Sequence, residues 1–85
     1  MKISASIYAY NNRMSLSEIV KTLDMLYIDS FHVDCNDDIS VFDDINLIRS
    51  ISNTPIDLHI ITDNPAKYYD LIEKYKIKIT HATPT

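Results

Sequence analysis

Two histidines and an aspartate fall where a strand pattern would bring them to one face. His32 and Asp34 are two residues apart in the alternating run 30–34, so their side chains leave the same side of a β-strand. His59 occupies the corresponding level of the run 56–62. Neighbouring strands lie about 4.8 Å apart, so the three side chains can converge. Two imidazoles and a carboxylate suit Zn²⁺, Fe²⁺, Mn²⁺ or Co²⁺, and they would leave coordination positions open for substrate oxygens.

The same residues also have a purely structural interpretation. A histidine on a strand is commonly buried and hydrogen-bonded to backbone or carboxylate, and spacing alone leaves this open for His32 and His59. Cys35 would point away from Asp34 and is interpreted as a small core residue. His81 lies at the predicted end of the last strand and is interpreted as terminal. A solvated loop and helix caps account for the remaining acidic pairs, Asp37-Asp38 and Asp43-Asp44.

Short strand-like runs alternate with amphipathic helical runs along the chain. A capping box of the form S-x-x-E begins at Ser15 and predicts the start of the first helix. Asp43 or Asp44 can cap a second helix. Asn64-Pro65 predicts the start of a third, with asparagine as the cap and proline in the first turn. We therefore expect three helices between strands near residues 3–9, 29–35, 56–62 and 77–81.

The β-α-β-α-β-α-β order predicts the fold class. Consecutive strands joined by helices run parallel, with right-handed crossovers. Four such strands in 85 residues amount to half of a (β/α)8 TIM barrel, which usually needs about 250 residues. No linker or repeat interrupts the chain, so residues 1–85 are expected to form a single half-barrel domain. Half a barrel leaves two strand edges unpaired, and we expect its inner face to be apolar. The chain should therefore form a homo-oligomer or be completed by a C-terminal half.

Composition argues against several function classes. The net charge of −4 disfavours nucleic acid and membrane surfaces as partners. The sequence contains no glycine, so it cannot hold a Walker A loop or a GxGxxG dinucleotide fingerprint. It also lacks the usual residue for helix C-caps. The single cysteine and the absence of a long apolar run predict a soluble, cytoplasmic protein.

Four segments resemble ribulose-phosphate 3-epimerases, in the same order and at nearly the same spacing. ISASI at 3–7 resembles that family's first strand, Ile-x-Pro-Ser-Ile/Leu, and FHVD at 31–34 resembles its second, His-Val-Asp. PIDLH at 55–59 is similar to its third strand, where Asp-Val-His follows a proline. DNPAKY at 63–68 is similar to its Glu/Asn-Pro-x-x-Tyr helix start. Together the four segments extend over most of the chain.

This resemblance implies a fold, a reaction and site residues. It implies a (β/α)8-barrel isomerase of the pentose phosphate pathway that inverts C3 of a ketopentose phosphate, converting ribulose 5-phosphate to xylulose 5-phosphate. The family residues that match His32, Asp34 and His59 bind a divalent metal, and the one matching Asp34 is also a catalytic acid/base. The residue matching Ser6 contacts substrate. Such an inversion needs two carboxylates on opposite faces and a metal to hold the enediolate charge.

The family pattern is only partly present in these residues. Its second carboxylate, on the seventh strand, and its phosphate-binding loops would lie beyond residue 85. The segment after Asp34 is shorter, and Ile60 stands where the family has a methionine. We therefore expect the 85-residue chain alone to lack epimerase activity. Two alternatives stay open: a non-catalytic half-barrel that self-associates or binds a partner, with a vestigial metal site, or a small metal-binding protein with unrelated chemistry.

Overall fold

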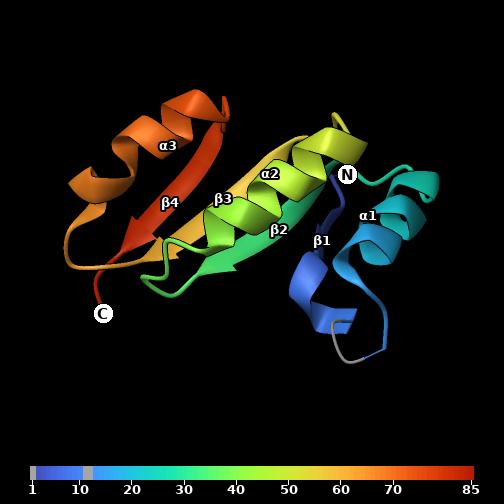
Figure 1. Cartoon of the computed structure of the whole chain (residues 1–85), viewed down its shortest axis with the longest axis horizontal. Coiled ribbons are helices and arrows are strands. Elements are labelled where there is room, and N and C mark those ends of the chain that lie inside the picture. The colour runs from blue at the N-terminus through green and yellow to red at the C-terminus, as the bar shows by residue number, and fades with distance from the viewer. Residues whose placement is uncertain (1, 11–12) are drawn as a thin grey trace.

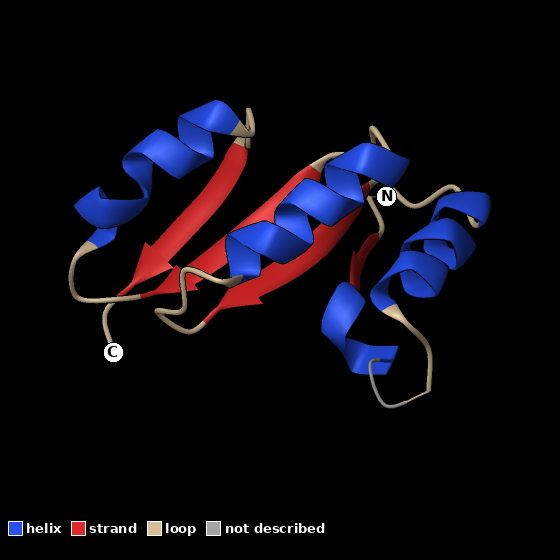
Figure 2. Cartoon of the chain, in the orientation of Figure 1, coloured by secondary structure: helices blue, strands red, loops and turns tan. Residues whose placement is uncertain are grey.

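The structure, a computed structural model, describes residues 2–10 and 13–85. Four parallel strands form one sheet in the order β1-β2-β3-β4, and the α-helices lie on one face of it (Figures 1 and 2). The strands are β1 (Ser4–Ser6), β2 (Ser30–Cys35), β3 (Ile56–Ile61) and β4 (Ile79–Thr83). The helices are α1 (Leu16–Met25), α2 (Val41–Ile51) and α3 (Tyr69–Lys74), with 3-10 helices η1 (Ile7–Tyr10) and η2 (Pro65–Tyr68).

The strand order identifies the architecture. In a doubly wound sheet the order reverses at a switch point, and helices cover both faces. Here spatial order equals chain order, so every crossover returns on the same side. The predicted α/β class with four parallel strands is confirmed, and the arrangement is consistent with half a TIM barrel.

The hydrophobic core lies between the sheet and the helices. β2 and β3 alternate, and every second residue faces the helices and is buried: Phe31, Val33, Cys35, Ile56, Leu58 and Ile60. The helical layer contributes Ile19, Val20, Leu23, Phe42, Ile45, Ile48 and Tyr68. Cys35 is fully buried, which confirms its interpretation as a core residue opposite Asp34.

Two strand boundaries differ from the prediction. β1 ends at Ser6, because Ile7 turns into the core and the Tyr8 hydroxyl donates to Asp44 Oδ2 of α2 at 2.8 Å. The predicted extension of this strand to residue 9 is therefore wrong. β4 begins only at Ile79 and runs to Thr83. His81 thus lies in the middle of the strand, and its interpretation as terminal is wrong.

The helix starts were predicted with mixed success. Ser15 is the N-cap of α1, and its Oγ accepts a hydrogen bond from the Glu18 amide at 3.2 Å. α2, however, begins at Val41, so neither predicted aspartate caps it and both lie in its first turn. The cause is a turn in which Asp38 Oδ1 accepts from the Ser40 amide and hydroxyl, which starts the helix earlier. Pro65 begins η2, and the α-helical turns follow from Tyr69.

The other face of the sheet is polar. Its residues are Ser4, Ser6, Ser30, His32, Asp34, Asp57, His59, His81 and Thr83, with Ile61 and Ile79 as apolar members. The expected apolar inner face is therefore wrong, because β2 and β3 alternate instead of being apolar on both sides as fully buried parallel strands are. Each helix in the described ranges is too short or too polar to cross a lipid bilayer.

Candidate metal centre

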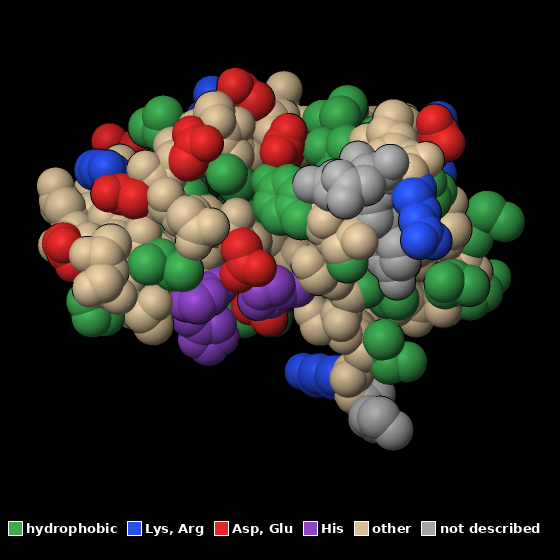
Figure 3. Space-filling model, turned by 90° about the horizontal axis from the view of Figure 1, so that it is seen from below, with side chains coloured by type: hydrophobic (Ala, Val, Ile, Leu, Met, Phe, Trp, Pro, Cys, Tyr) green, Lys and Arg blue, Asp and Glu red, His purple; other side chains and the backbone are tan. Residues whose placement is uncertain are grey.

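Two pairs of residues that lie in register on the neighbouring strands β2 and β3 form the candidate centre. Asp34 is directly opposite His59 in the parallel register, and His32 is opposite Asp57 one pleat earlier. Because residues two apart on a strand share a face, all four side chains project from the polar side of the sheet. Figure 3, in which the molecule of Figure 1 is seen from below, shows histidine side chains next to one another with acidic side chains beside them.

The Asp34 carboxylate is the common neighbour of both imidazoles. Its Oδ1 lies 2.9 Å from His32 Nε2 and 3.3 Å from His59 Nδ1. One ligand atom from each of the three residues falls within 4.8 Å of the others. In a tetrahedral zinc site, bonds of roughly 2.0–2.1 Å place neighbouring ligands roughly 3.3 Å apart. The three residues could therefore hold a metal ion.

Each imidazole also has an oxygen beside its other nitrogen. His32 Nδ1 lies 3.5 Å from Asp57 Oδ2, and His59 Nε2 lies 3.0 Å from Thr83 Oγ1. In metal-binding histidines the outer nitrogen typically donates to a carboxylate, a backbone carbonyl or water, and here a carboxylate and a hydroxyl lie beside the two outer nitrogens. The arrangement thus leaves His32 Nε2 and His59 Nδ1 directed at a common centre.

The surroundings favour a cation. In the ion pairs of the described chain, Asp34 and Asp57 contact only imidazoles, and no lysine or arginine neutralises them. The side chains of His32 and His59 are 31% and 30% exposed, and that of Asp34 is 43% exposed. The centre is therefore open to solvent on one side, so an ion can enter and keep positions for other ligands.

A second polar cluster anchors the loop that follows β2. Asp37 Oδ1 accepts from the Tyr68 hydroxyl at 2.7 Å and pairs with Lys67 Nζ at 2.6 Å. The Lys67 ammonium, together with the Tyr68 hydrogen bond, lowers the pKa of Asp37 to about 2. Burial raises the pKa of the Tyr68 hydroxyl, and its bond to Asp37 raises it further. This cluster ties the carboxyl end of β2 to η2, which follows β3.

The structure brings His32, Asp34 and His59 together as predicted. Ser6 is in register with His32 on the same face, half-buried, and its contact with substrate stays a prediction. His81 is in register with His59, and its Nε2 lies 3.8 Å from Asp57 Oδ1, so it borders the centre.

Sequence reasoning missed two residues of this centre. Asp57 precedes His59 by two positions, so the same period-two argument would have placed it on this face. Thr83 lies beyond the predicted end of the last strand, and no pattern in the sequence pointed to it.

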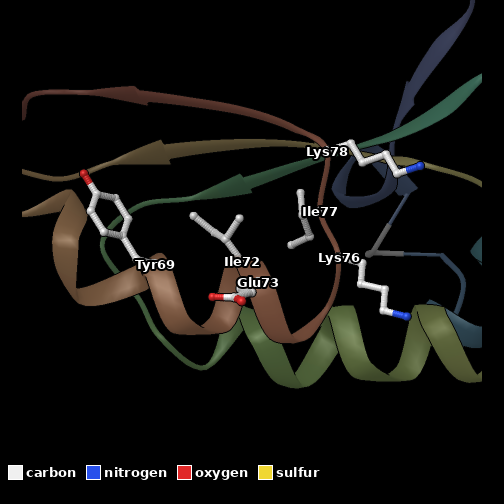
Figure 4. A pocket seen from close by; sticks show the side chains of 6 residues that line it. All are labelled: Tyr69, Ile72, Glu73, Lys76, Ile77 and Lys78. Carbon is white, nitrogen blue, oxygen red and sulfur yellow. The ribbon is translucent and has the colours of Figure 1, made fainter.

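A separate groove of about 500 Å³ lies on the helix side of the sheet. Its lining residues come from α3 and the segment leading into β4: Tyr69, Ile72, Glu73, Lys76, Ile77 and Lys78 (Figure 4). Because the imidazoles project from the opposite face, this groove is not part of the candidate metal centre.

Comparisons of the chain with protein-family models, with curated proteins and with solved structures find no match. The resemblance to ribulose-phosphate 3-epimerases stays a hypothesis based on the four segments quoted above. Function is therefore inferred from the residues and their geometry.

Proposed function

We propose that this half-barrel binds one divalent transition-metal ion through His32, Asp34 and His59, as part of a ribulose-phosphate 3-epimerase-like site. The observation that carries the proposal is that Asp34 Oδ1 lies within 3.3 Å of an inward nitrogen on each histidine. The outer nitrogens are each supported by an oxygen, from Asp57 and Thr83. A cluster of structural histidines would not need both features.

The proposed chemistry is proton transfer next to a carbonyl. When bound, the ion supplies a Lewis acid that stabilises the negative charge of an enediolate. Asp34 lies beside the ion position and is the proposed acid/base that removes the proton. Ser6, in register with His32 on the same face, is the proposed substrate contact. A ketopentose phosphate is the proposed substrate class, by the resemblance alone.

Inversion also requires a second acid/base on the opposite side of the substrate. Asp57 does not meet this need, because it lies on the same sheet face and contacts His32 Nδ1. We infer that the opposing group comes from a C-terminal half, because a second copy of this chain would add another histidine cluster but no phosphate-binding loops. The 85-residue chain alone should therefore show no measurable turnover of ribulose 5-phosphate, and robust turnover would contradict this part of the proposal.

Calorimetric titration with Zn²⁺, Mn²⁺ and Fe²⁺ at neutral pH tests the metal site. The wild-type chain should bind one ion, and His32→Ala and His59→Ala should each abolish stoichiometric binding. His81→Ala is the matched control, a histidine of the same face that is not a proposed ligand, and it should keep the stoichiometry. Binding should weaken below about pH 6, because imidazoles coordinate metals only when neutral. The absence of saturable binding to the wild type would overturn the proposal.

A second candidate is a non-catalytic half-barrel that self-associates. The observation that favours it is that β1 and β4 each pair with only one strand in the described chain. In this case the histidine cluster would be vestigial. A stable oligomer whose mass and stability do not respond to metal would favour this candidate over the first.

A further inference from the structure

Asp57 occupies an unusual position beneath the candidate centre. It is in register with His32, and its Oδ2 lies 3.5 Å from His32 Nδ1. Its Oδ1 is buried and has no hydrogen-bond partner among the residues that the structure describes. His81 Nε2, at 3.8 Å from Oδ1, is too far away for a formed hydrogen bond. An aspartate is thus held in a place where its polar atoms are poorly satisfied.

Such a placement is costly for the folded chain. A buried acceptor without a partner destabilises the folded chain, and more so when the group is charged. An apolar residue at this position would avoid that cost while keeping the strand. A function for the carboxylate at this position would account for the cost.

A neutral imidazole carries one N–H, and the nitrogen that bears it decides which nitrogen of His32 can bind an ion. His32 Nε2 lies 2.9 Å from Asp34 Oδ1, and the tautomer of the ring decides whether this nitrogen carries a proton. An ion can bind Nε2 only when this nitrogen carries no proton, so the N–H of the neutral ring must then be on Nδ1. Nδ1 faces Asp57 Oδ2, an acceptor that a small movement of the ring would bring within hydrogen-bond distance.

We propose that Asp57 is a positioning residue that holds His32 in its Nδ1–H tautomer and thereby directs Nε2 at the metal ion. This inference rests on the proposed metal site and adds to it a residue that does not itself bind the ion. Outer carboxylates of this kind typically change metal affinity by about 10- to 100-fold. Asp57 should therefore change affinity without changing the number of ions bound.

The test compares zinc affinity in Asp57→Ala, Asp57→Asn and the wild-type chain, by competition with a chromophoric chelator. Asp57→Ala should bind one zinc ion about 10- to 100-fold more weakly. Asparagine has nearly the same shape as aspartate and retains one acceptor oxygen, so Asp57→Asn should lose less zinc affinity than Asp57→Ala. This variant also keeps the test valid if Asp57→Ala fails to fold. The matched control is Asp70→Ala, an exposed aspartate of α3, which should keep wild-type affinity.

A second readout separates positioning from general structural support. Nitrogen-15 NMR of the zinc-loaded chain should show His32 protonated at Nδ1, with a protected proton that is lost in Asp57→Ala. An affinity in Asp57→Ala within about threefold of the wild type would overturn the inference while leaving the metal site intact. Protonation of His32 at Nε2 in the zinc-loaded chain would overturn the inference and also the assignment of Nε2 as the metal-binding nitrogen. A wild-type chain that binds no zinc would overturn both proposals.

Discussion

At the scale of single residues, Asp37 links the two strands that carry the candidate centre. Its carboxylate holds Lys67 and Tyr68 of η2, and its own backbone has a φ of 55°, in the left-handed region. A non-glycine residue in that region is strained, so the interactions of the side chain must maintain the conformation. The loop after β2 therefore depends on one charged group.

Asp37 should contribute to the pH dependence of stability. Its folded-state pKa of about 2 lies below the ordinary value of 3.8, so its contribution is complete above about pH 4 and is lost as pH falls towards 2. Urea unfolding between pH 2 and 6 should show this loss in the wild type. In Asp37→Asn the free energy of unfolding should fall less steeply as the pH decreases. Lys67→Gln removes the ammonium that pairs with Asp37 and should also make the free energy of unfolding fall less steeply with decreasing pH. An unchanged slope in both variants would contradict the role of this ion pair.

The three proposed metal ligands could be predicted from the sequence. Of the two residues that support them, Asp57 could have been predicted and Thr83 could not. His32 and Asp34 share a face at any strand register, because side-chain alternation is a local property. Placing His59 beside them required only that β2 and β3 pair in parallel, which a helical crossover dictates. Thr83 was not predictable, because its position depends on where β4 begins, and that is decided by the end of α3.

At the scale of elements, the lack of glycine has a visible consequence at helix ends. Tyr27 and Lys76, which follow the C-caps of α1 and α3, have φ values of 57° and 53°. At the end of α3 the Lys76 amide donates to the Glu73 carbonyl at 3.1 Å and the Ile77 amide donates to the Ile72 carbonyl at 3.0 Å. This is a Schellman motif, in which glycine usually occupies the left-handed position. The same bonds keep Ile77 out of β4.

Replacing Lys76 by glycine should stabilise the protein. A left-handed conformation costs a non-glycine residue roughly 1–2 kcal/mol, and the extra entropy of glycine in the unfolded chain offsets part of this gain. We expect a net increase of up to about 1 kcal/mol in the free energy of unfolding by urea. The matched control Lys74→Gly lies within the helical turns of α3 and should cost about 1 kcal/mol. Equal destabilisation by both variants would contradict the account.

Element boundaries were less predictable than element types. The capping box gave the start of α1 because both of its residues are local in sequence. The start of α2 was missed because Asp38 and Ser40 form a turn that competes with a cap at Asp43 or Asp44. β1 was predicted too long because Ile7 is apolar in either conformation, and only its tertiary contacts make it part of η1.

At the scale of the whole molecule, both edges of the sheet are unpaired within the described chain. β1 has β2 as its one neighbour, and β4 has β3. Apolar grooves also lie at α1 and α3, the first and the last α-helix of the described chain. One lies against α3 (Figure 4), and the other is lined by Met14, Ile19, Thr22, Leu23 and Leu26 at α1. Unpaired parallel edges favour association with another chain.

We therefore expect the chain not to exist as a free monomer at micromolar concentration. A two-fold arrangement that joins β1 of one copy to β4 of the other would satisfy both edges and approach a closed barrel. It would also enclose the polar face, so the two histidine clusters would face a common interior. Light scattering coupled to size exclusion should give at least twice the chain mass. A monodisperse species of 9.8 kDa with sharp amide spectra would contradict this expectation.

Fold class was predictable at this scale, but the character of the inner face was not recognised. Helical crossovers between short strands force a parallel sheet, so the order of elements was enough to predict half a barrel. The apolar inner face was expected from parallel sheets in general. The polar residues at 32, 34, 57 and 59 already indicated that β2 and β3 are buried on one side only.

Anomalous X-ray diffraction at the zinc edge, from crystals of the zinc-loaded chain, tests the central claim most directly. The account predicts one strong peak per chain on the polar face of the sheet, at roughly 2.0–2.2 Å from His32 Nε2, His59 Nδ1 and an Asp34 oxygen. A crystal of His59→Ala grown under the same conditions should lack that peak. A full-strength peak at other residues, or none at this centre in the wild-type crystal, would contradict the account.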